Sequence, residues 1–507
     1  MHSPTRAVIE LDIPGATISR HLYGHFAEHL GRCIYDGFWV GDDSDIPNTG
    51  GIRNDIVDAL RDLRIPNLRW PGGCFADEYH WRDGVGPREQ RPRMVNSHWG
   101  DVVENNHFGT HEFMALCELL GAAPYVNGNV GSGTVQEMSE WVEYLTRGDD
   151  SPMAALRRSN GRDEPWKVPF WGIGNEPWGC GGNMRAEAYA DLARQYSTYL
   201  RNHADNRLYR IAAGADAEAY FWTKALMETA KGPSGGHPFE AISLHYYTVP
   251  GGNWRGRGTA TGFDADGYYS TMVRAVRVEE VISRHSAIMD VEDPERNIGL
   301  VLDEWGTWWD VEPGTNPGFL YQQNTMRDAL VATVHFDAFH RHADRLAMAN
   351  IAQTVNVLQS VVLTDPQTNQ LILTPTYHAF AMNVGHHDAQ ALPTHLSGVP
   401  VHDVDGVELS TVSASASTKD DKALVSVTNL AAEDSATVIL DLRGRTVTDV
   451  RGRILTSDEL NAHNTATAPE AVTVRDFHVA RTQDAFGHGL QLDMPPHSYV
   501  TVELDLV

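Results

Sequence analysis

The stretch PFWGIGNEPWG, residues 169–179, begins with apolar side chains and ends in Asn175 and Glu176 among glycines. Such a run is typical of a buried strand that stops at a polar loop. The stretch IGLVLDEWG, residues 298–306, has the same form and reaches Glu304. Two strands that each end at a carboxylate predict a fold in which strand ends meet at one polar cleft.

Six further stretches resemble these two, and helical patterns lie between them. The other expected strands cover residues 21–29, 65–73, 124–131, 209–218, 240–248 and 346–357. Apolar side chains at three- and four-residue spacing predict helices over residues 54–64, 111–121, 184–204, 271–285 and 325–343. Eight strands that alternate with helices predict a (β/α)8 TIM barrel, and a doubly wound open sheet is the alternative.

The pattern changes after residue 385, where side chains alternate with period two. In SYVTVELDLV, residues 498–507, one face carries Val500, Val502, Leu504 and Leu506, whereas Thr501, Glu503 and Asp505 lie on the other. This alternation predicts a half-buried antiparallel sheet. Residues 8–13 alternate likewise. We therefore predict an α/β plus all-β chain: a barrel over residues 19–385, and a jelly-roll-like β-sandwich formed by residues 1–18 and 386–507, with a linker near 392–406.

Composition excludes several classes of protein. The 507 residues include 40 Lys and Arg against 67 Asp and Glu, a net charge of −27, which argues against nucleic acid or an anionic membrane as a partner. Four cysteines are too few for a disulfide framework. No apolar run approaches the roughly 20 residues of a membrane span, and residues 1–15 show no secretion signal. We expect a cytoplasmic protein.

Polar residues gather at the carboxyl ends of the predicted strands, and tryptophans follow in the next loops. The strand ends supply Glu28, Cys74, Asn129, Asn175, Glu176, His245, Tyr247, Glu304 and Gln353, and the loops supply Trp178, Trp305, Trp308 and Trp309. Amides and carboxylates bind hydroxyl groups, and aromatic faces cover C–H surfaces, so this mixture is typical of sugar recognition. Two glutamates at strand ends can act as general acid and nucleophile in glycoside hydrolysis.

Two other functional classes, a zinc protease and a non-catalytic carbohydrate-binding protein, are alternatives. His25-Phe-Ala-Glu28-His29 fits the H-x-x-E-H zinc-protease signature, which requires a helix, although the segment follows an apolar pair and has the pattern of a strand end. A non-catalytic carbohydrate-binding protein would leave Glu176 and Glu304 unexplained. The stretch NGNVGSG, residues 127–133, does not match the dinucleotide-binding pattern.

Five segments together resemble the α-L-arabinofuranosidases of glycoside hydrolase family 51. They are YGHFAEHLGRCIYDG (23–37), LRWPGGCFADEYHWRDGVGP (68–87), GIGNEPWGCGGNM (172–184), ISLHYYT (242–248) and LVLDEWGTWW (300–309). The resemblance implies a barrel with a β-sandwich, Glu176 as acid/base and Glu304 as nucleophile. It also implies an arabinose subsite lined by Glu28, Asn175, His245, Tyr247 and Gln353, and a homo-oligomer, a hexamer or smaller. We expect no metal and no cofactor.

The resemblance implies a retaining double displacement that releases terminal non-reducing α-L-arabinofuranosyl residues from arabinose-containing oligo- and polysaccharides. A β-xylosidase or an endoglucanase on the same scaffold is the alternative. Trp178 and Trp308 are expected to contact the sugar. The loop from Asp83 to His107 is long for a βα loop, and its Trp99 and His98 are expected to cover the cleft.

Cys74 stands where many members of that family have an asparagine. Cys74 follows the second predicted strand and Cys180 follows the fourth, so both are expected at the same face of the barrel. A Cys74–Cys180 disulfide that braces the loop carrying Trp178 is one reading. Two free thiols are the other, which a reducing cytoplasm favours. Because it replaces a sugar-contacting asparagine of the family, Cys74 is also expected among the residues that bind the substrate.

Overall fold

The computed structural model describes residues 4–230, 236–484 and 487–507, and eight parallel strands in it close into a barrel. Closure is complete because β13 pairs with β2, so the predicted (β/α)8 barrel is confirmed and the open sheet is excluded. The strands are β2 (Gly24–Phe26), β5 (Asn67–Trp70), β8 (Ala123–Gly128), β9 (Phe170–Ile173), β10 (Tyr209–Asp216), β11 (Ala241–Thr248), β12 (Gly299–Thr307) and β13 (Leu346–Ile351).

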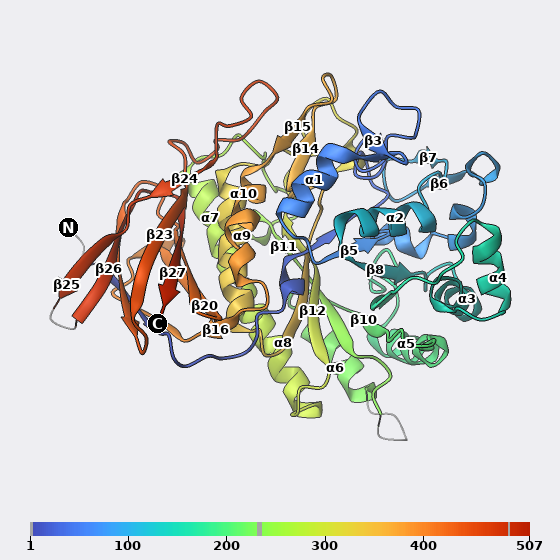
Figure 1. Cartoon of the computed structure of the whole chain (residues 1–507), viewed down its shortest axis with the longest axis horizontal. Coiled ribbons are helices and arrows are strands. Elements are labelled where there is room, and N and C mark those ends of the chain that lie inside the picture. The colour runs from blue at the N-terminus through green and yellow to red at the C-terminus, as the bar shows by residue number, and fades with distance from the viewer. Residues whose placement is uncertain (1–3, 231–235, 485–486) are drawn as a thin grey trace.

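Helices surround the barrel (Figure 1). They are α1 (Asn54–Asp62), α2 (Thr110–Leu120), α3 (Val135–Thr146), α4 (Pro152–Ser159), α5 (Ala186–Tyr199), α6 (Tyr220–Thr229), α7 (Ala265–Val276), α8 (Val278–Glu292), α9 (Met326–Arg341) and α10 (Pro375–Met382). Local sequence fixes their starts: the side chain of Thr134 caps α3, and Thr325 with Asp328 forms a capping box on α9. No helix in the described part of the chain is long and apolar enough to cross a membrane.

The C-terminal region forms two facing sheets, and the N-terminal strand belongs to one of them. The first sheet contains β17 (Thr394–Ser397), β1 (Thr5–Glu10), β22 (Ala436–Arg443), β26 (Gly487–Met494) and β25 (Ala480–Asp484) in that order. The second contains β16 (Gln390–Leu392), β20 (Val412–Lys419), β21 (Lys422–Asn429), β27 (Ser498–Leu506), β23 (Val447–Leu455) and β24 (Val474–Phe477). The predicted β-sandwich with the N-terminal strand is thus present, whereas the domain boundaries stay a prediction.

Two expectations about this region are wrong. Residues 392–406 are not a linker, because β17 pairs with β1 and β18 (Val401–Val404) pairs with β19 (Val407–Ser410). Thr501 is not on a solvated face: it is fully buried, like Val500 and Val502. The reason is that the second sheet packs on the sandwich core with one face and on barrel helix α9 with the other, where Thr428 bonds Thr333.

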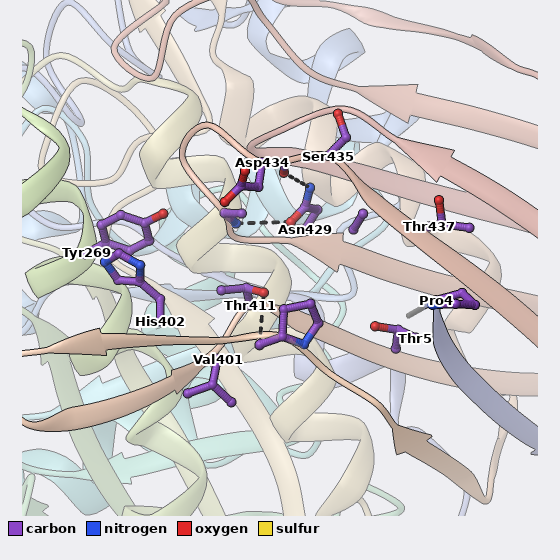
Figure 2. A pocket seen from close by; sticks show the side chains of 13 residues that line it. Pro4, Thr5, Tyr269, Val401, His402, Thr411, Asn429, Asp434, Ser435 and Thr437 are labelled. Atoms are coloured by element: carbon purple, nitrogen blue, oxygen red, sulfur yellow. Dashed lines mark hydrogen bonds between the residues drawn. The ribbon is translucent and has the colours of Figure 1, made fainter. Parts of the chain in front are cut away.

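Polar side chains join the barrel to the sandwich. Asp337 of α9 accepts hydrogen bonds from the hydroxyls of Ser413 and Ser415 on β20, at 2.5 and 2.6 Å. Figure 2 shows a pocket elsewhere on this junction, where Tyr269 of α7 stacks on His402 of β18 with ring centroids 3.8 Å apart. These bonds fix the sandwich against the outer helices and leave the carboxyl ends of the barrel strands free for a site.

Candidate active site

Glu304 lies within β12 and points into the barrel, where two donors hold its carboxylate. Arg69 of β5 donates from Nη1 to Oε1 at 2.8 Å, and the hydroxyl of Tyr247 on β11 donates to Oε2 at 2.8 Å. Arg69 is itself buried, stacks over Phe26 and donates to the side-chain oxygen of Asn175 at 2.7 Å. The carboxylate is therefore fixed in one orientation and balanced by a permanent positive charge.

Glu176 follows β9 in a turn with unusual backbone geometry. Gly174 has a φ of 76° and Glu176 itself a φ of 39°, in the left-handed region that a glutamate rarely adopts. The buried carboxylate of Asp77 accepts from the backbone N–H of Asn175 at 2.9 Å and from those of Val130 and Gly131. Strained backbone of this kind persists only where neighbours hold it in place, and it is common at functional sites.

His245 of β11 connects the two glutamates. Its Nδ1 lies 2.8 Å from Oε1 of Glu176 and 3.5 Å from Oε2 of Glu304, while its Nε2 lies 3.2 Å from the carboxylate of Asp303. One oxygen of Glu176, the ring nitrogen of His245 and one oxygen of Glu304 all lie within 4.8 Å of one another. The two glutamates thus face a single small space.

Carboxylates outnumber cations here, and this imbalance acts together with burial on the protonation states. Arg69 pairs with Asp303 and Glu304, and His245 pairs with Glu176, Asp303 and Glu304. Glu28 adds a further carboxylate beside Glu304. Although burial acts to lower it, the carboxylates raise the pKa of His245 well above its ordinary value. Burial raises the pKa of Glu176, and the charge of Glu304 adds to that effect, whereas the hydrogen bond from His245 opposes it. Glu176 is therefore a carboxyl suited to carry a proton.

Glu28 follows β2 and gathers four donors. Its Oε1 accepts from the backbone N–H groups of Gly73 and Phe75 and from Nε1 of Trp99, and its Oε2 accepts from Gln353 at 2.7 Å. Burial, with the charge of Glu304, raises its pKa to about 7 against these donors. A Cβ at Gly73 would lie 2.7 Å from an oxygen of Glu304, which explains why glycine is needed there.

Cys74 and Cys180 form a disulfide, with Cα atoms 5.5 Å apart. The bridge joins the loop after β5 to the loop that carries Glu176 and Trp178. Cys180 Sγ lies 3.5 Å from Oε2 of Glu176. Trp178 donates from Nε1 to the carbonyl of Gly214 at 3.1 Å, which fixes its ring. Cys33 and Cys117 are free and buried.

The tryptophans expected at the cleft divide into two groups. Trp99, Trp178 and Trp308 are partly exposed. Trp305 and Trp309 are not in the cleft, so that expectation is wrong: Trp305 follows inward-facing Glu304 in a strand, hence points outward, and is fully buried. Trp309 is buried on Arg327 and donates to Asp328; both lie on α9.

Several other residues depart from what the sequence predicted. Asn129 does not face the cleft, because its side chain closes a turn by bonding Ser132 and Gly133. The zinc-protease reading is also wrong: residues 24–26 form a strand, so His25 and His29 do not share a helix face. His29 instead accepts from Trp70 at 3.2 Å.

Four residues of the site did not stand out in the sequence: Arg69, Asp77, Trp254 and Asp303. Arg69 and Asp303 lie inside strands, next to residues that did, and strand alternation places Arg69 opposite to the outward Trp70. Trp254 is 48% exposed and meets the ring of Trp308 edge-on at 5.4 Å, in a loop whose sequence gives no periodic signal.

Comparisons with known proteins agree with this geometry. Models of the α-L-arabinofuranosidase 1 domain and of the α-L-arabinofuranosidase C-terminal domain match residues 59–257 and 303–498. An intracellular exo-α-L-arabinofuranosidase of Bacteroides ovatus is 51% identical over 96% of this chain and 93% of its own. The chain belongs to the family 51 α-L-arabinofuranosidases. It is a glycoside hydrolase.

Solved structures of this family share the whole architecture. The enzyme superimposes on the family 51 arabinofuranosidase of Xanthomonas axonopodis pv. citri with a TM-score of 0.95 and 48% identity, over 99% of this chain and 100% of the other. The α-L-arabinofuranosidase of Thermotoga maritima, solved with arabinose, gives a TM-score of 0.85 at 30% identity, over 99% and 100%. Barrel and sandwich therefore belong together in this family.

Replacement of Trp99 tests whether the long loop takes part in the site. Trp99→Ala should lower kcat/KM by about tenfold, since leaving the buried Glu28 carboxyl without this donor costs about 1–3 kcal/mol, while the melting temperature changes little. Val103→Ala is the matched control, because Val103 lies on the same loop and is 63% exposed. Unchanged kinetics with a large loss of stability would show that Trp99 only packs against its neighbours.

Proposed function

We propose that the enzyme hydrolyses α-L-arabinofuranosides with retention, using Glu304 as nucleophile and Glu176 as acid/base. One observation carries this proposal: oxygens of the two carboxylates lie within 4.8 Å of each other. Retaining glycosidases separate their carboxyl groups by about 5–5.5 Å, whereas inverting enzymes need about 6.5–9.5 Å to admit water. The separation supports the retaining class.

In the first step, the Glu304 carboxylate attacks the anomeric carbon and forms a glycosyl ester, while the bond to the leaving oxygen breaks. Glu176 gives its proton to that oxygen. Tyr247 and Arg69 keep the attacking carboxylate in position. In the second step, ionised Glu176 takes a proton from water, the water oxygen attacks the anomeric carbon, and the ester bond to Glu304 breaks.

Buried polar side chains around this pair support an arabinose subsite. Asn175, His245 and Gln353 are 1–3% exposed, too little for ordinary surface groups. They surround the two glutamates with Glu28 and Tyr247, through the bonds His245–Glu176, Tyr247–Glu304, Arg69–Asn175 and Gln353–Glu28. Their donors and acceptors suit sugar hydroxyls. The partly exposed rings of Trp99, Trp178 and Trp308 offer apolar contact to the sugar. Cys74 has no free thiol to offer a sugar hydroxyl, because its sulfur is bonded to Cys180.

The relatives support terminal arabinofuranosyl groups of arabinose-containing oligo- and polysaccharides as substrates, since one of them is named an exo-α-L-arabinofuranosidase. The same relative is named intracellular, which supports the expected cytoplasmic location. A homo-oligomer, a hexamer or smaller, stays a prediction.

An NMR time course of hydrolysis tests the mechanism. With an aryl α-L-arabinofuranoside, the arabinofuranose that forms first should have the α configuration, before it equilibrates with other forms. If the β anomer appears first, the enzyme inverts, and Glu304 is not a nucleophile. An aryl β-D-xylopyranoside serves as the comparison substrate and should react far more slowly.

A further inference from the structure

The disulfide lies directly against the proposed acid/base group. Both cysteines are partly exposed, and Cys180 Sγ is 3.5 Å from Oε2 of Glu176. The sulfur of Cys74, the sulfur of Cys180 and a carboxylate oxygen of Glu176 all lie within 4.8 Å of one another. A structural brace could lie anywhere along these two loops, but this one places two sulfurs beside the group that moves protons.

Reduction would change the chemistry of this cluster. A dithiol reductant supplies two electrons and two protons, the S–S bond breaks, Cys74 and Cys180 become thiols, and the dithiol becomes a disulfide. Thiolates are ligands for soft cations, unlike the bridged sulfurs. Loss of the two thiol protons on metal binding would then leave two thiolates and one carboxylate facing one point.

Three ligand atoms would fill three of the four positions of a tetrahedral site and leave one open. Zinc binds thiolate sulfur at about 2.3 Å and carboxylate oxygen at about 2.0–2.2 Å, so three ligand atoms already grouped within 4.8 Å need only small movements. Cys180 lies between Gly179 and Gly181. A Cβ at Gly179 would meet no atom closer than 3.8 Å, whereas a Cβ at Gly181 would lie 1.9 Å from the carbonyl oxygen of Asn175, so the chain is open on one side of Cys180 and closely packed on the other.

His245 orients the carboxylate of Glu176 for such an ion. His245 holds the other oxygen of Glu176, Oε1, at 2.8 Å, which leaves Oε2 facing Cys180. A neighbour that fixes a ligating carboxylate in this way strengthens metal sites in general. The surplus of carboxylates around Glu304 also favours a cation over an anion at this place.

We propose that reduction of the Cys74–Cys180 disulfide creates a site for a thiophilic divalent cation such as Zn²⁺ or Cd²⁺, with Cys74, Cys180 and Glu176 as ligands. The bound ion inhibits hydrolysis, because it occupies the carboxylate that must exchange protons with the leaving group. Inhibition therefore requires both a reduced Cys74–Cys180 pair and a sufficient concentration of the cation. The inhibition rests on the proposed role of Glu176, whereas the binding does not.

Cadmium is the probe, because its thiolate complexes absorb in the ultraviolet. The whole protein is reduced with a dithiol, desalted without oxygen and titrated with Cd²⁺, and the oxidised protein is titrated in parallel. We expect two additional reactive thiols after reduction, one Cd²⁺ per chain with thiolate absorption, and at least a tenfold loss of activity that a chelator reverses. The oxidised protein should show neither binding nor inhibition.

Variants identify the ligands. Cys180→Ser and, independently, Cys74→Ser should lose the thiolate absorption, and Glu176→Gln should weaken Cd²⁺ binding. Cys117→Ser is the matched control, since this buried thiol lies on α2, and it should bind as the wild type does. Thermal unfolding verifies that each variant is folded.

Three results would overturn the proposed site: no new thiols after dithiol treatment of the folded protein, no Cd²⁺ absorption in the reduced wild type, or unchanged absorption in both serine variants. Binding without inhibition would overturn the inhibitory half of the proposal, whereas the role of Glu176 as acid/base is tested separately by the kinetics of Glu176→Ala. The failure of the site and the failure of the proposed mechanism therefore give different results.

Discussion

Glu304→Ala should abolish turnover on every arabinofuranoside, by roughly 10⁴-fold or more, whatever the leaving group. Without this carboxylate no glycosyl ester can form, and Arg69 and Tyr247 have no nucleophile to position. Initial rates with an activated aryl substrate and with an arabino-oligosaccharide measure the effect. The loss should be of similar size on both, because the missing group acts in the bond-forming step that all substrates share.

Glu218→Ala is the matched control for this variant. Glu218 follows β10 at the same end of the barrel, but it pairs with Arg274 and Arg277 and not with the site. Its replacement should leave kcat within a few-fold of the wild type. Azide gives a further criterion: in Glu304→Ala it can attack the sugar directly and should yield an arabinosyl azide of inverted configuration. An active Glu304→Ala enzyme would contradict the assignment.

The sequence predicted the barrel and most of the cleft for one physical reason. Carboxyl ends of barrel strands meet at one face, so polar residues that end apolar runs, such as Glu28, Glu176 and Glu304, must approach one another. No detailed contact had to be known. The same logic brought Cys74 and Cys180 to one face, although whether they bridge depended on a Cα separation that only the structure gives.

The residues that sequence analysis missed depend on contacts within the barrel. In the sequence, Arg69 is a single charged residue within a predicted strand. Only the structure shows that its positive charge neutralises the carboxylate of Glu304. Asp77 looks like part of a polar loop, yet its carboxylate accepts three backbone N–H groups that shape the turn before Glu176. Trp305 could have been placed correctly, because alternation sends it outward when Glu304 points inward.

In the sandwich, the alternation of side chains predicts one face of a strand but not the surroundings of the other. Alternation at Val500 and Val502 identified the inner face, but it cannot tell whether the outer face is solvated or covered. Thr501 is buried because barrel helix α9 packs on the outer face of this sheet. Helix and strand are far apart in the sequence, so the contact cannot be predicted from the strand alone. A threonine side chain fits both a solvated and a covered face, so the residue type at position 501 does not distinguish them.

Glu176→Ala should slow hydrolysis according to the leaving group. A poor leaving group needs the proton that Glu176 supplies, so kcat on oligosaccharides should fall by about 10²–10⁴-fold, whereas activated aryl arabinofuranosides should lose much less in the first step. Plotting the rate against leaving-group pKa, for the wild type and the variant, measures this directly. An equal loss on all substrates would contradict an acid role, and Glu218→Ala again serves as the control.

The pH profile and azide complete the argument for Glu176. Burial and the charge of Glu304 raise its pKa, and the protonated form is the active one, so wild-type activity should be present below that pKa and lost as pH rises through it. The variant should lack this basic limb with an activated substrate. Azide can occupy the space of the missing carboxylate and attack the glycosyl ester on Glu304, so it should accelerate turnover and give an arabinosyl azide of retained configuration. That product is the opposite of the one expected from Glu304→Ala, which assigns the two carboxylates to different steps, and identical products from both variants would refute the assignment.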